Sequence, residues 1–297
     1  MKRIYFILFF LSFISTLFSQ TKDENDFYQL DKAREHIKSG AIEKGLKFID
    51  SILQINPSNP YAWELKGSLY ANEFNDYYKA IINYKKFEAI FPDEALNLAN
   101  IGKNYFKLDS IEQGKKYILR AFEIDPYNEY IIVQYAYNIS KSVSEKVKLY
   151  QNALIVSKLK LEQGKQPTKS VMRDIYNNLG YNLYVNQQFM ESTVSLLEGL
   201  KYVEESDEYF NNLGNSLQRL NYLQNALDYY DKALQIEPKK VFSLNGKANT
   251  FQKLQQIDSA CIYWKKAIDN GYVFKEEWRE IWNIEDPKLL LSKYCSD

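Results

Sequence analysis

The sequence predicts an all-α fold of about seven stacked helix pairs, and three observations support this prediction. Small residues recur in block after block at two fixed gaps, 12 and 7 residues. Pro residues close several of these blocks, and Pro92 and Pro126 stand 34 residues apart. Self-similarity at a fixed period of roughly 20–50 residues is typical of repeat architectures, in which each unit buries its apolar face against its neighbours.

The first 19 residues have the composition of a secretory signal peptide. Lys2 and Arg3 precede an apolar run over residues 4–18, and Ser19 is a small residue suited to the position before a cleavage site. The run is short for a bilayer span, which needs about 20 apolar residues. We therefore expect an exported protein, periplasmic or secreted from a Gram-negative bacterium, with no membrane span after cleavage. An uncleaved anchor is the alternative.

Each repeat unit carries one small residue in its first helix, at position 8, and two in its second, at positions 20 and 27. Four triplets follow this pattern: Ala33, Gly45 and the larger Ile52; Gly180, Ser192 and Gly199; Gly214, Ala226 and Ala233; Ala248, Ala260 and Ala267. Small residues let paired helices approach closely, and bulky ones such as Tyr84, Tyr230 and Trp264 fill the space beside them. The residue before a Pro is disfavoured in a helix, so Pro57, Pro92, Pro126 and Pro238 follow helix ends.

These signals divide the chain into units 26–59, 60–94, 95–128, 129–166, 171–206, 207–240 and 241–272. The fourth unit is degenerate, because Ala136 and Ala153 are 17 residues apart where the other units give 19. Ser142 and Glu145 have capping-box spacing and start a helix that we expect to reach about Glu162. Residues 166–170 then break it. We expect a front block over 26–166 and a rear block over 171–272.

Residues 273–297 are expected to cap the last repeat. Trp278, Ile281 and Trp282 fall at helical i, i+3, i+4 spacing, which favours a capping helix, with an aromatic sugar-binding platform as the alternative. Two cysteines, Cys261 and Cys295, lie near this end. Two independent small apolar side chains are the favoured interpretation, and a disulfide that ties the tail to the last repeat is the alternative in an exported protein.

The second and third units resemble the tetratricopeptide repeat. The second unit carries Trp63, Leu65, Gly67, Tyr70, Ala80, Tyr84, Phe87 and Pro92, with one extra residue between its helices. The third carries Ile101, Gly102, Tyr105, Gly114, Ile118, Ala121 and Pro126. The resemblance extends over about 26–272. It implies a right-handed α-solenoid of the tetratricopeptide type, whose first helices line a concave groove that binds peptide or protein segments.

The same resemblance implies that the groove is lined by positions 2, 5, 9, 12 and 13 of each first helix. In the rear block these positions give our candidate peptide-binding residues: Asn177, Tyr181, Asn211, Asn215, Arg219, Asn245, Asn249 and Lys253. A carboxamide has one acceptor and two donors, so a row of Asn side chains could hold the C=O and N–H groups of an extended peptide. Ordinary variation within the family, without a ligand, is the alternative.

Composition and motifs argue against catalysis and against nucleic-acid binding. Without Lys2 and Arg3 the chain has 36 basic and 38 acidic side chains, whereas nucleic-acid binding needs a basic surface. His36 is the single histidine, and the sequence has no phosphate-binding Gly-rich loop, nucleophile elbow or Cys/His cluster. We expect that the protein is not an enzyme and binds no cofactor or metal. We expect an adaptor that binds a protein or peptide ligand. A cell-envelope scaffold acting through its convex face or by self-association, or a carbohydrate-binding helical module, is the alternative. Partner identity and oligomeric state stay open.

Overall fold

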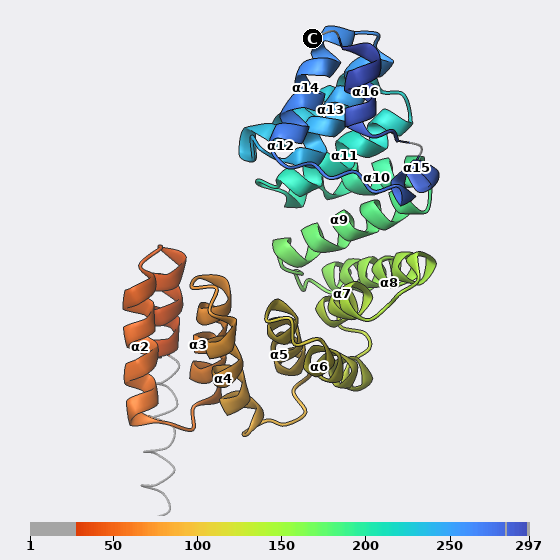
Figure 1. The fold of residues 1–297 in the computed structure, drawn as a ribbon. Helices are drawn as coiled ribbons and strands as arrows, with labels where there is room; N and C mark the ends of the chain where they lie inside the picture. The colour runs from red at the N-terminus through yellow and green to blue at the C-terminus, as the bar shows by residue number, and fades with distance from the viewer. Residues whose placement is uncertain (1–27, 283, 296–297) are drawn as a thin grey trace, which may run out of the picture. The chain divides into compact units, whose positions relative to one another are not determined.

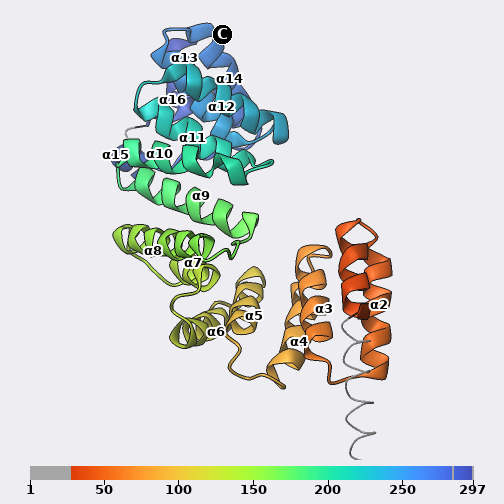
Figure 2. The same ribbon diagram turned by 180° about the vertical axis from the view of Figure 1, so that it is seen from behind.

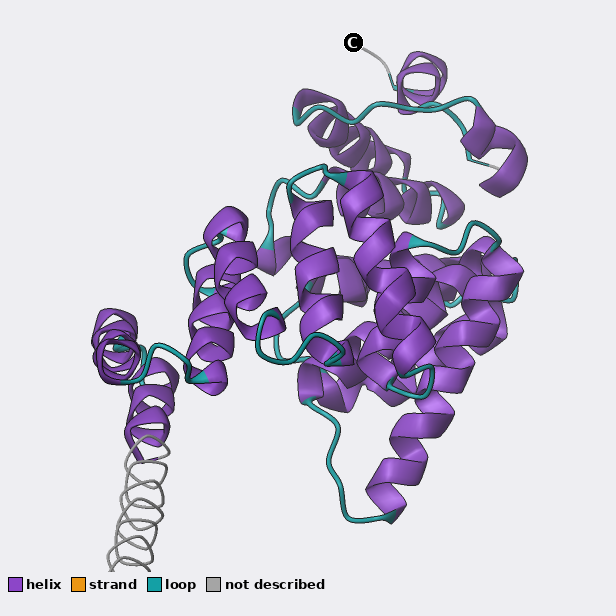
Figure 3. Ribbon diagram, turned by 90° about the horizontal axis from the view of Figure 1, so that it is seen from below, coloured by secondary structure: helices purple, strands orange, loops and turns teal. Residues whose placement is uncertain are grey.

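The computed structural model describes residues 28–282 and 284–295, and every regular element in that part of the chain is helical (Figures 1 and 3). The chain divides into two compact units, one ending at Pro126 and the other starting at Tyr127. The predicted signal peptide lies outside the described residues. The predicted all-α fold is confirmed.

The first compact unit holds three helix pairs. Residues 28–38 are helical and precede α2 (Ile42–Ile55), α3 (Pro60–Asn72), α4 (Tyr77–Glu88), α5 (Ala95–Lys107) and α6 (Ile111–Ile124). Each helix from α2 to α5 packs against the next one along the chain. Asn59 and Asp76 cap α3 and α4, because their side chains accept hydrogen bonds from Ala62 N and Lys79 N. The three pairs coincide with the first three predicted repeats.

The second compact unit holds four further pairs and the carboxyl-terminal segment. Its helices are α7 (Glu129–Asn138), α8 (Val143–Glu162), α9 (Lys169–Val185), α10 (Phe189–Gly199), the short 3-10 helix η1 (Leu200–Tyr202), α11 (Asp207–Arg219), α12 (Leu223–Ile236), α13 (Val241–Lys253), α14 (Ile257–Asp269), α15 (Glu277–Trp282) and α16 (Pro287–Tyr294). The pairs follow one another from α7 to α14 (Figures 1 and 2). They coincide with the fourth to seventh predicted repeats.

The degenerate fourth repeat has a short first helix and a long second one. Helix α7 has 10 residues and α8 has 20, and Glu145 N donates to the Ser142 hydroxyl at 3.4 Å to cap α8 as the sequence predicts. Helix α8 packs against α9, so the two repeats on either side of 166–170 stay in contact. The chain instead divides after Pro126, ahead of that break.

Position 24 of each second helix carries a large buried side chain, and we call these residues the buried column of their unit. The members are exposed by 3% or less: Ile49, Tyr84, Ile118, Tyr150, Leu196, Tyr230 and Trp264. A Cβ added to Gly67 would lie 2.9 Å from the Tyr84 ring, and one added to Gly180 would lie 2.4 Å from Leu196 Cγ. Position 8 is therefore small because position 24 of the same pair fills the space beside it.

The carboxyl-terminal segment folds back onto the last repeats. Helix α16 packs against α14, and Leu290 lies in one apolar cluster with Ala248, Ala260 and Trp264. A disulfide joins Cys261 to Cys295, with the two Cα atoms 5.9 Å apart. The favoured interpretation of two independent thiols is therefore wrong. Spacing along the chain could not show that α16 returns the tail to α14.

Trp278, from the aromatic stripe at 278–282, packs against the apolar cluster of Leu244 in α13, Ala267 in α14 and Tyr272. Its ring also lies 6.0 Å from Phe242 and 6.3 Å from Phe274, measured between centroids. The side chains of Ile281 and Trp282 lie outside the described part of the structure. Helix α16 covers a second part of the last helix pair, because its leucines reach the cluster of Ala248, Ala260 and Trp264.

Candidate functional site

The eight candidate residues lie on three neighbouring first helices, α9, α11 and α13. We call the side of these helices that carries them the first-helix face. Asn177 and Tyr181 come from α9, three residues from α11 and three from α13. Helix α11 contacts both α9 and α13. The fold therefore brings residues that are 34 positions apart in the sequence onto three adjacent helices of the second unit.

At position 5 the asparagines connect neighbouring helices. Asn177 Oδ1 accepts a hydrogen bond from Asn212 Nδ2 at 2.9 Å, and Asn211 Oδ1 accepts from the Ser243 hydroxyl at 3.0 Å. Asn177 is half-buried, whereas Asn211 is only 7% exposed. Asn211 therefore offers little surface to a ligand.

Asn245 is buried beside Tyr272, which lies in the loop after α14. Asn245 is 4% exposed, and its Nδ2 donates to the Tyr272 hydroxyl at 3.1 Å. Its Oδ1 is buried without a hydrogen-bond partner among the described residues. The predicted row at position 5 thus leaves Asn177 as its accessible member.

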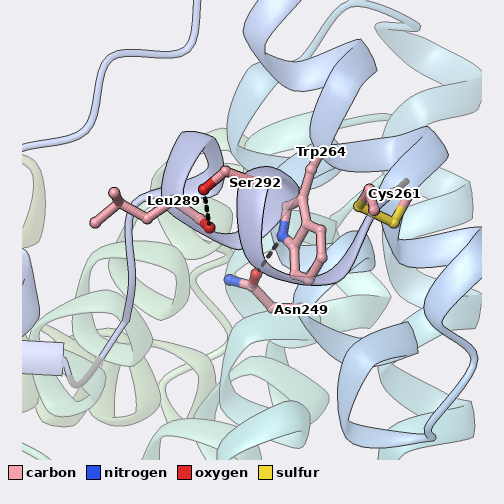
Figure 4. The surroundings of a disulfide bond; sticks show 6 residues. Asn249, Cys261, Trp264, Leu289 and Ser292 are labelled. Atoms are coloured by element: carbon pink, nitrogen blue, oxygen red, sulfur yellow. Dashed lines mark hydrogen bonds between the residues drawn. A yellow bond between two sulfur atoms is a disulfide. The ribbon is translucent and has the colours of Figure 1, made fainter. Parts of the chain in front are cut away.

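At position 9 the asparagines accept hydrogen bonds from the buried column. Tyr230 donates its hydroxyl to Asn215 Oδ1 at 2.8 Å, and Trp264 Nε1 donates to Asn249 Oδ1 at 2.7 Å (Figure 4). An indole N–H can only donate, so the amide oxygen of Asn249 must face Trp264. The NH₂ group of Asn249 is therefore turned away from Trp264, and the NH₂ group of Asn215 is likewise turned away from Tyr230.

Three carboxamides of the first-helix face have oxygens that already accept a hydrogen bond within the protein. They belong to Asn177, Asn215 and Asn249, and all three side chains are half-buried. Each oxygen keeps one lone pair but is turned toward its protein donor, so the NH₂ group is the main group offered to a ligand. The arrangement suits ligands rich in acceptor oxygens, such as main-chain carbonyls and carboxylates.

The sequence contained a signal for this arrangement that the repeat analysis did not use. Asn215 precedes Tyr230 by 15 residues, and Asn249 precedes Trp264 by the same distance. In the fifth repeat position 9 is Tyr181 and position 24 is the apolar Leu196, which has no hydrogen to donate. Asn thus occurs in the rear repeats where the column residue needs an acceptor.

Two cations lie at the carboxyl ends of α11 and α13. The Arg219 guanidinium lies 4.6 Å from the centroid of the Phe189 ring. Lys253 Nζ donates to the Gln218 carbonyl at 3.3 Å. Burial, and then the positive charge of Arg219, lower the pKa of Lys253. The two cations thus stand close enough to repel each other, and Lys253 has no carboxylate partner among the described residues.

The aromatic residues of α9 form the other end of the first-helix face. Tyr181 is 43% exposed, and Tyr184 packs edge-on against Phe189 at 5.4 Å. Burial raises the pKa of both tyrosine hydroxyls, so they stay neutral hydrogen-bond donors at neutral pH. This end therefore offers an apolar surface beside the amide donors.

A cavity of about 400 Å³ lies between the carboxyl ends of these helices and the folded-back tail. It is lined on the repeat side by Gln218, Arg219, Asn249, Gln252 and Lys253, and on the tail side by Ile284, Glu285, Leu289, Leu290, Lys293 and Tyr294. Three of the eight candidate residues therefore belong to this cavity, which the sequence did not predict.

Neither a metal site nor a membrane helix is found in the described part of the chain. No cluster of three His, Cys, Asp or Glu side chains there could hold a metal ion. None of its helices combines the length and the apolar character that crossing a bilayer requires.

Two segments match models of the tetratricopeptide repeat, residues 96–128 and 207–240. They are the third and sixth predicted repeats. No curated protein matches the chain.

Among solved structures, the chain is similar to one in the crystal structure of the APC/C hetero-tetramer Cut9-Hcn1. The TM-score is 0.67 at 15% identity, over 76% of this chain and 42% of that one, so the chain spans less than half of that relative. It is also similar to YrrB, described as a TPR protein with an unusual peptide-binding site (TM-score 0.48, 16% identity, 63% of this chain and 92% of that one). A third match is pilF of Pseudomonas aeruginosa (TM-score 0.43, 14% identity, 92% and 99%).

Proposed function

We propose that this chain, a helical solenoid of tetratricopeptide type, is an exported adaptor that holds an extended segment of another protein on its first-helix face. The observation that supports this proposal is the set of amide donors at Asn177, Asn215 and Asn249, whose oxygens are already used inside the protein. Half-buried N–H groups gain most from a ligand that brings acceptor oxygens.

An extended peptide is a suitable ligand because its backbone offers a carbonyl at every residue, about 3.3–3.6 Å apart. Amide donors can hold such a backbone without reading its side chains. Tyr181 and Tyr184 add an apolar surface at one end of the face, and Arg219 and Lys253 add positive charge at the other. We therefore expect a segment with apolar residues toward one end and acidic groups toward the other.

Export is part of this proposal and is supported by the signal-peptide composition of residues 1–19. The Cys261–Cys295 disulfide adds support, because such bonds persist in oxidising compartments and are rare in the cytosol. The sugar-platform alternative has less support, since the Trp278 ring packs against Phe242, Tyr272 and Phe274.

The test is the double variant Asn177→Asp/Asn215→Asp. Asp keeps the shape and the oxygen that accepts from Asn212 or Tyr230, but it removes the N–H donors and adds charge that repels carbonyl oxygens. We expect partner recovery to fall about tenfold or more, since a hydrogen bond at such a site contributes about 1–1.5 kcal/mol. Recovery is measured by affinity purification with quantitative mass spectrometry from the envelope of the native host.

The matched control is Asn186→Asp/Asn221→Asp, which adds the same charge at exposed turn residues outside the face. Both proteins are compared by thermal unfolding, so that a folding defect is recognised. The control variant should recover the same proteins as the unaltered chain. If the Asn177→Asp/Asn215→Asp variant also does so, the first-helix face is not the binding site and the proposal fails.

A further inference from the structure

The cavity between α11, α13 and α16 has an unusual balance of hydrogen-bonding groups. On the repeat side it presents the NH₂ group of Asn249, because the Asn249 oxygen is held by Trp264 (Figure 4). The side-chain nitrogen of Gln218, which is 8% exposed, is tied to the Gly246 carbonyl and the Thr250 hydroxyl at 2.9 and 2.7 Å. The wall on this side is therefore fixed in orientation before any ligand arrives.

Positive charge dominates the lining of the cavity. Arg219, Lys253 and Lys293 carry three charges, and Glu285 carries the one opposing charge. Glu285 faces Arg279, whose Nε lies 3.5 Å from its carboxylate, so its charge is compensated from outside the cavity. Neither Lys253 nor Lys293 forms an ion pair with any carboxylate that the structure describes. Lys253 is partly buried and Lys293 is exposed at the rim, and clustered cations without a counter-charge favour the binding of an anion.

The tail-side wall is held in place by a covalent bond. Cys295 directly follows α16, and its disulfide to Cys261 fixes that end of the helix to α14 (Figure 4). Leu290 packs into the cluster of Ala248, Ala260 and Trp264 and holds the middle of the helix. Lys293 reaches the cavity only when α16 lies in this position.

We infer that this cavity binds an oxyanion, a carboxylate or a phosphate group, between Arg219, Lys253, Lys293 and the Asn249 amide, and that the Cys261–Cys295 disulfide keeps the site assembled. The inference rests on the proposed function in one respect: the anionic group belongs to the segment held on the first-helix face, of which the cavity is the continuation. Binding of the group itself requires no partner protein.

The experiment titrates the purified, oxidised chain with succinate and, separately, with inorganic phosphate at constant ionic strength. The ¹⁵N-detected indole N–H signal of Trp264 is the readout, because that N–H donates to Asn249, whose amide contacts the ligand. We expect a saturable shift with at least one probe. A shift with succinate alone assigns a carboxylate, one with phosphate alone assigns a phosphate group, and one with both assigns a general oxyanion site. No saturable shift with either probe refutes the inference.

Charge variants localise the binding. Lys253→Gln is expected to raise the dissociation constant about tenfold or more, because the variant loses a hydrogen bond to a charged group. The matched control is Lys232→Gln, at an exposed lysine of α12 that does not line the cavity. An equal loss in both variants would show only unspecific attraction of anions, and the inference would be wrong.

Two further variants test the wall formed by α16. We expect Lys293→Gln and Cys261→Ala/Cys295→Ala each to weaken binding about tenfold, since each removes a contact or its support. Unchanged binding in the Lys293 variant excludes α16 from the site, even if the cysteine variant fails to fold. Asn177→Asp/Asn215→Asp leaves the cavity residues in place, so its effect on partner recovery is separate from these titrations.

Discussion

At the scale of single residues, the asparagines of the rear repeats serve the protein's own interior as well as its surface. Tyr230 and Trp264 are fully buried, and each donates its one polar hydrogen to an asparagine, Asn215 or Asn249. A buried donor without a partner costs about 1–3 kcal/mol. The internal role also determines which amide atoms stay available, so in the proposed binding mode stability and recognition depend on the same side chains.

Tyr150 shows the opposite case at the same repeat position. It is fully buried in α8, and its hydroxyl has no hydrogen-bond partner among the residues that the structure describes. Position 9 of that repeat is Tyr137, which is 64% exposed. Tyr150→Phe is expected to raise the free energy of unfolding by about 1–2 kcal/mol, because it removes an unsatisfied polar group. Urea unfolding followed by circular dichroism measures the change.

The matched control for that prediction is Tyr230→Phe. The same atom is removed, but here the hydroxyl donates to Asn215, so the free energy of unfolding should fall by about 1 kcal/mol. Equal changes in the two variants would contradict the view that hydrogen bonding to position 9 distinguishes them.

At the scale of elements, the turn between the two helices of a pair repeatedly contains a residue with a positive φ angle, which is strained for residues other than Gly. One residue in each of five such turns is left-handed without being Gly, with φ between 52° and 64°: Asn75, Asp109, Gln187, Asn221 and Gln255. The first repeat uses Gly40 at φ 78°. Asn and Asp tolerate this conformation better than Gln does.

Gln187→Gly is therefore expected to raise the free energy of unfolding by about 0.5–1 kcal/mol, because Gly adopts positive φ without steric strain. The control is the neighbouring Gln188→Gly, where φ is −88°, so Gly relieves no strain. It brings the entropic penalty of Gly and removes the oxygen that accepts from Asn186 Nδ2. Thermal unfolding compares the two. A lower midpoint for the Gln187 variant than for the Gln188 variant would contradict this reading of the turn.

At the scale of the whole molecule, buried tyrosines couple stability to alkaline pH. Burial, with a smaller contribution from Glu198, raises the pKa of Tyr176 to about 12, and burial raises the pKa of Tyr209 and Tyr230 further. A pKa raised on folding means that the neutral form is favoured in the folded state. Its stabilisation is complete below the unfolded pKa, near 10, and is lost as the pH rises through the folded value.

We therefore expect the urea midpoint to fall between pH 9 and pH 11.5 at constant ionic strength. Tyr176→Phe should reduce the slope of this decline, because one of the coupled groups is gone. Tyr61→Phe, which changes a 54% exposed ring, is the control and should leave the slope unaltered. A midpoint that does not change over this range would rule out the coupling.

The sequence by itself determined the all-α fold, the helix pairs and the three first helices that carry the candidate residues. These features depend on local signals, such as Pro57 and Pro126 after helix ends, the Ser142 cap of α8, and small residues opposite large ones within one repeat. Such signals act over a few residues or over one period, so a single chain displays them completely.

Only the tertiary structure decided how the amides are turned, that Cys261 pairs with Cys295, and that α16 closes a basic cavity over α13. The disulfide and the cavity depend on the tail, which leaves the repeat pattern after Gly271 and returns to α14 along a path the sequence does not mark. The amides recur 15 residues before Tyr230 and Trp264, but that spacing alone does not show which amide atom faces the buried ring. The same limit explains why Asn245 was expected on the surface and lies beneath Tyr272. Repetition specifies how neighbours stack, whereas the fold of the segment beyond the last repeat depends on which apolar surface it can cover.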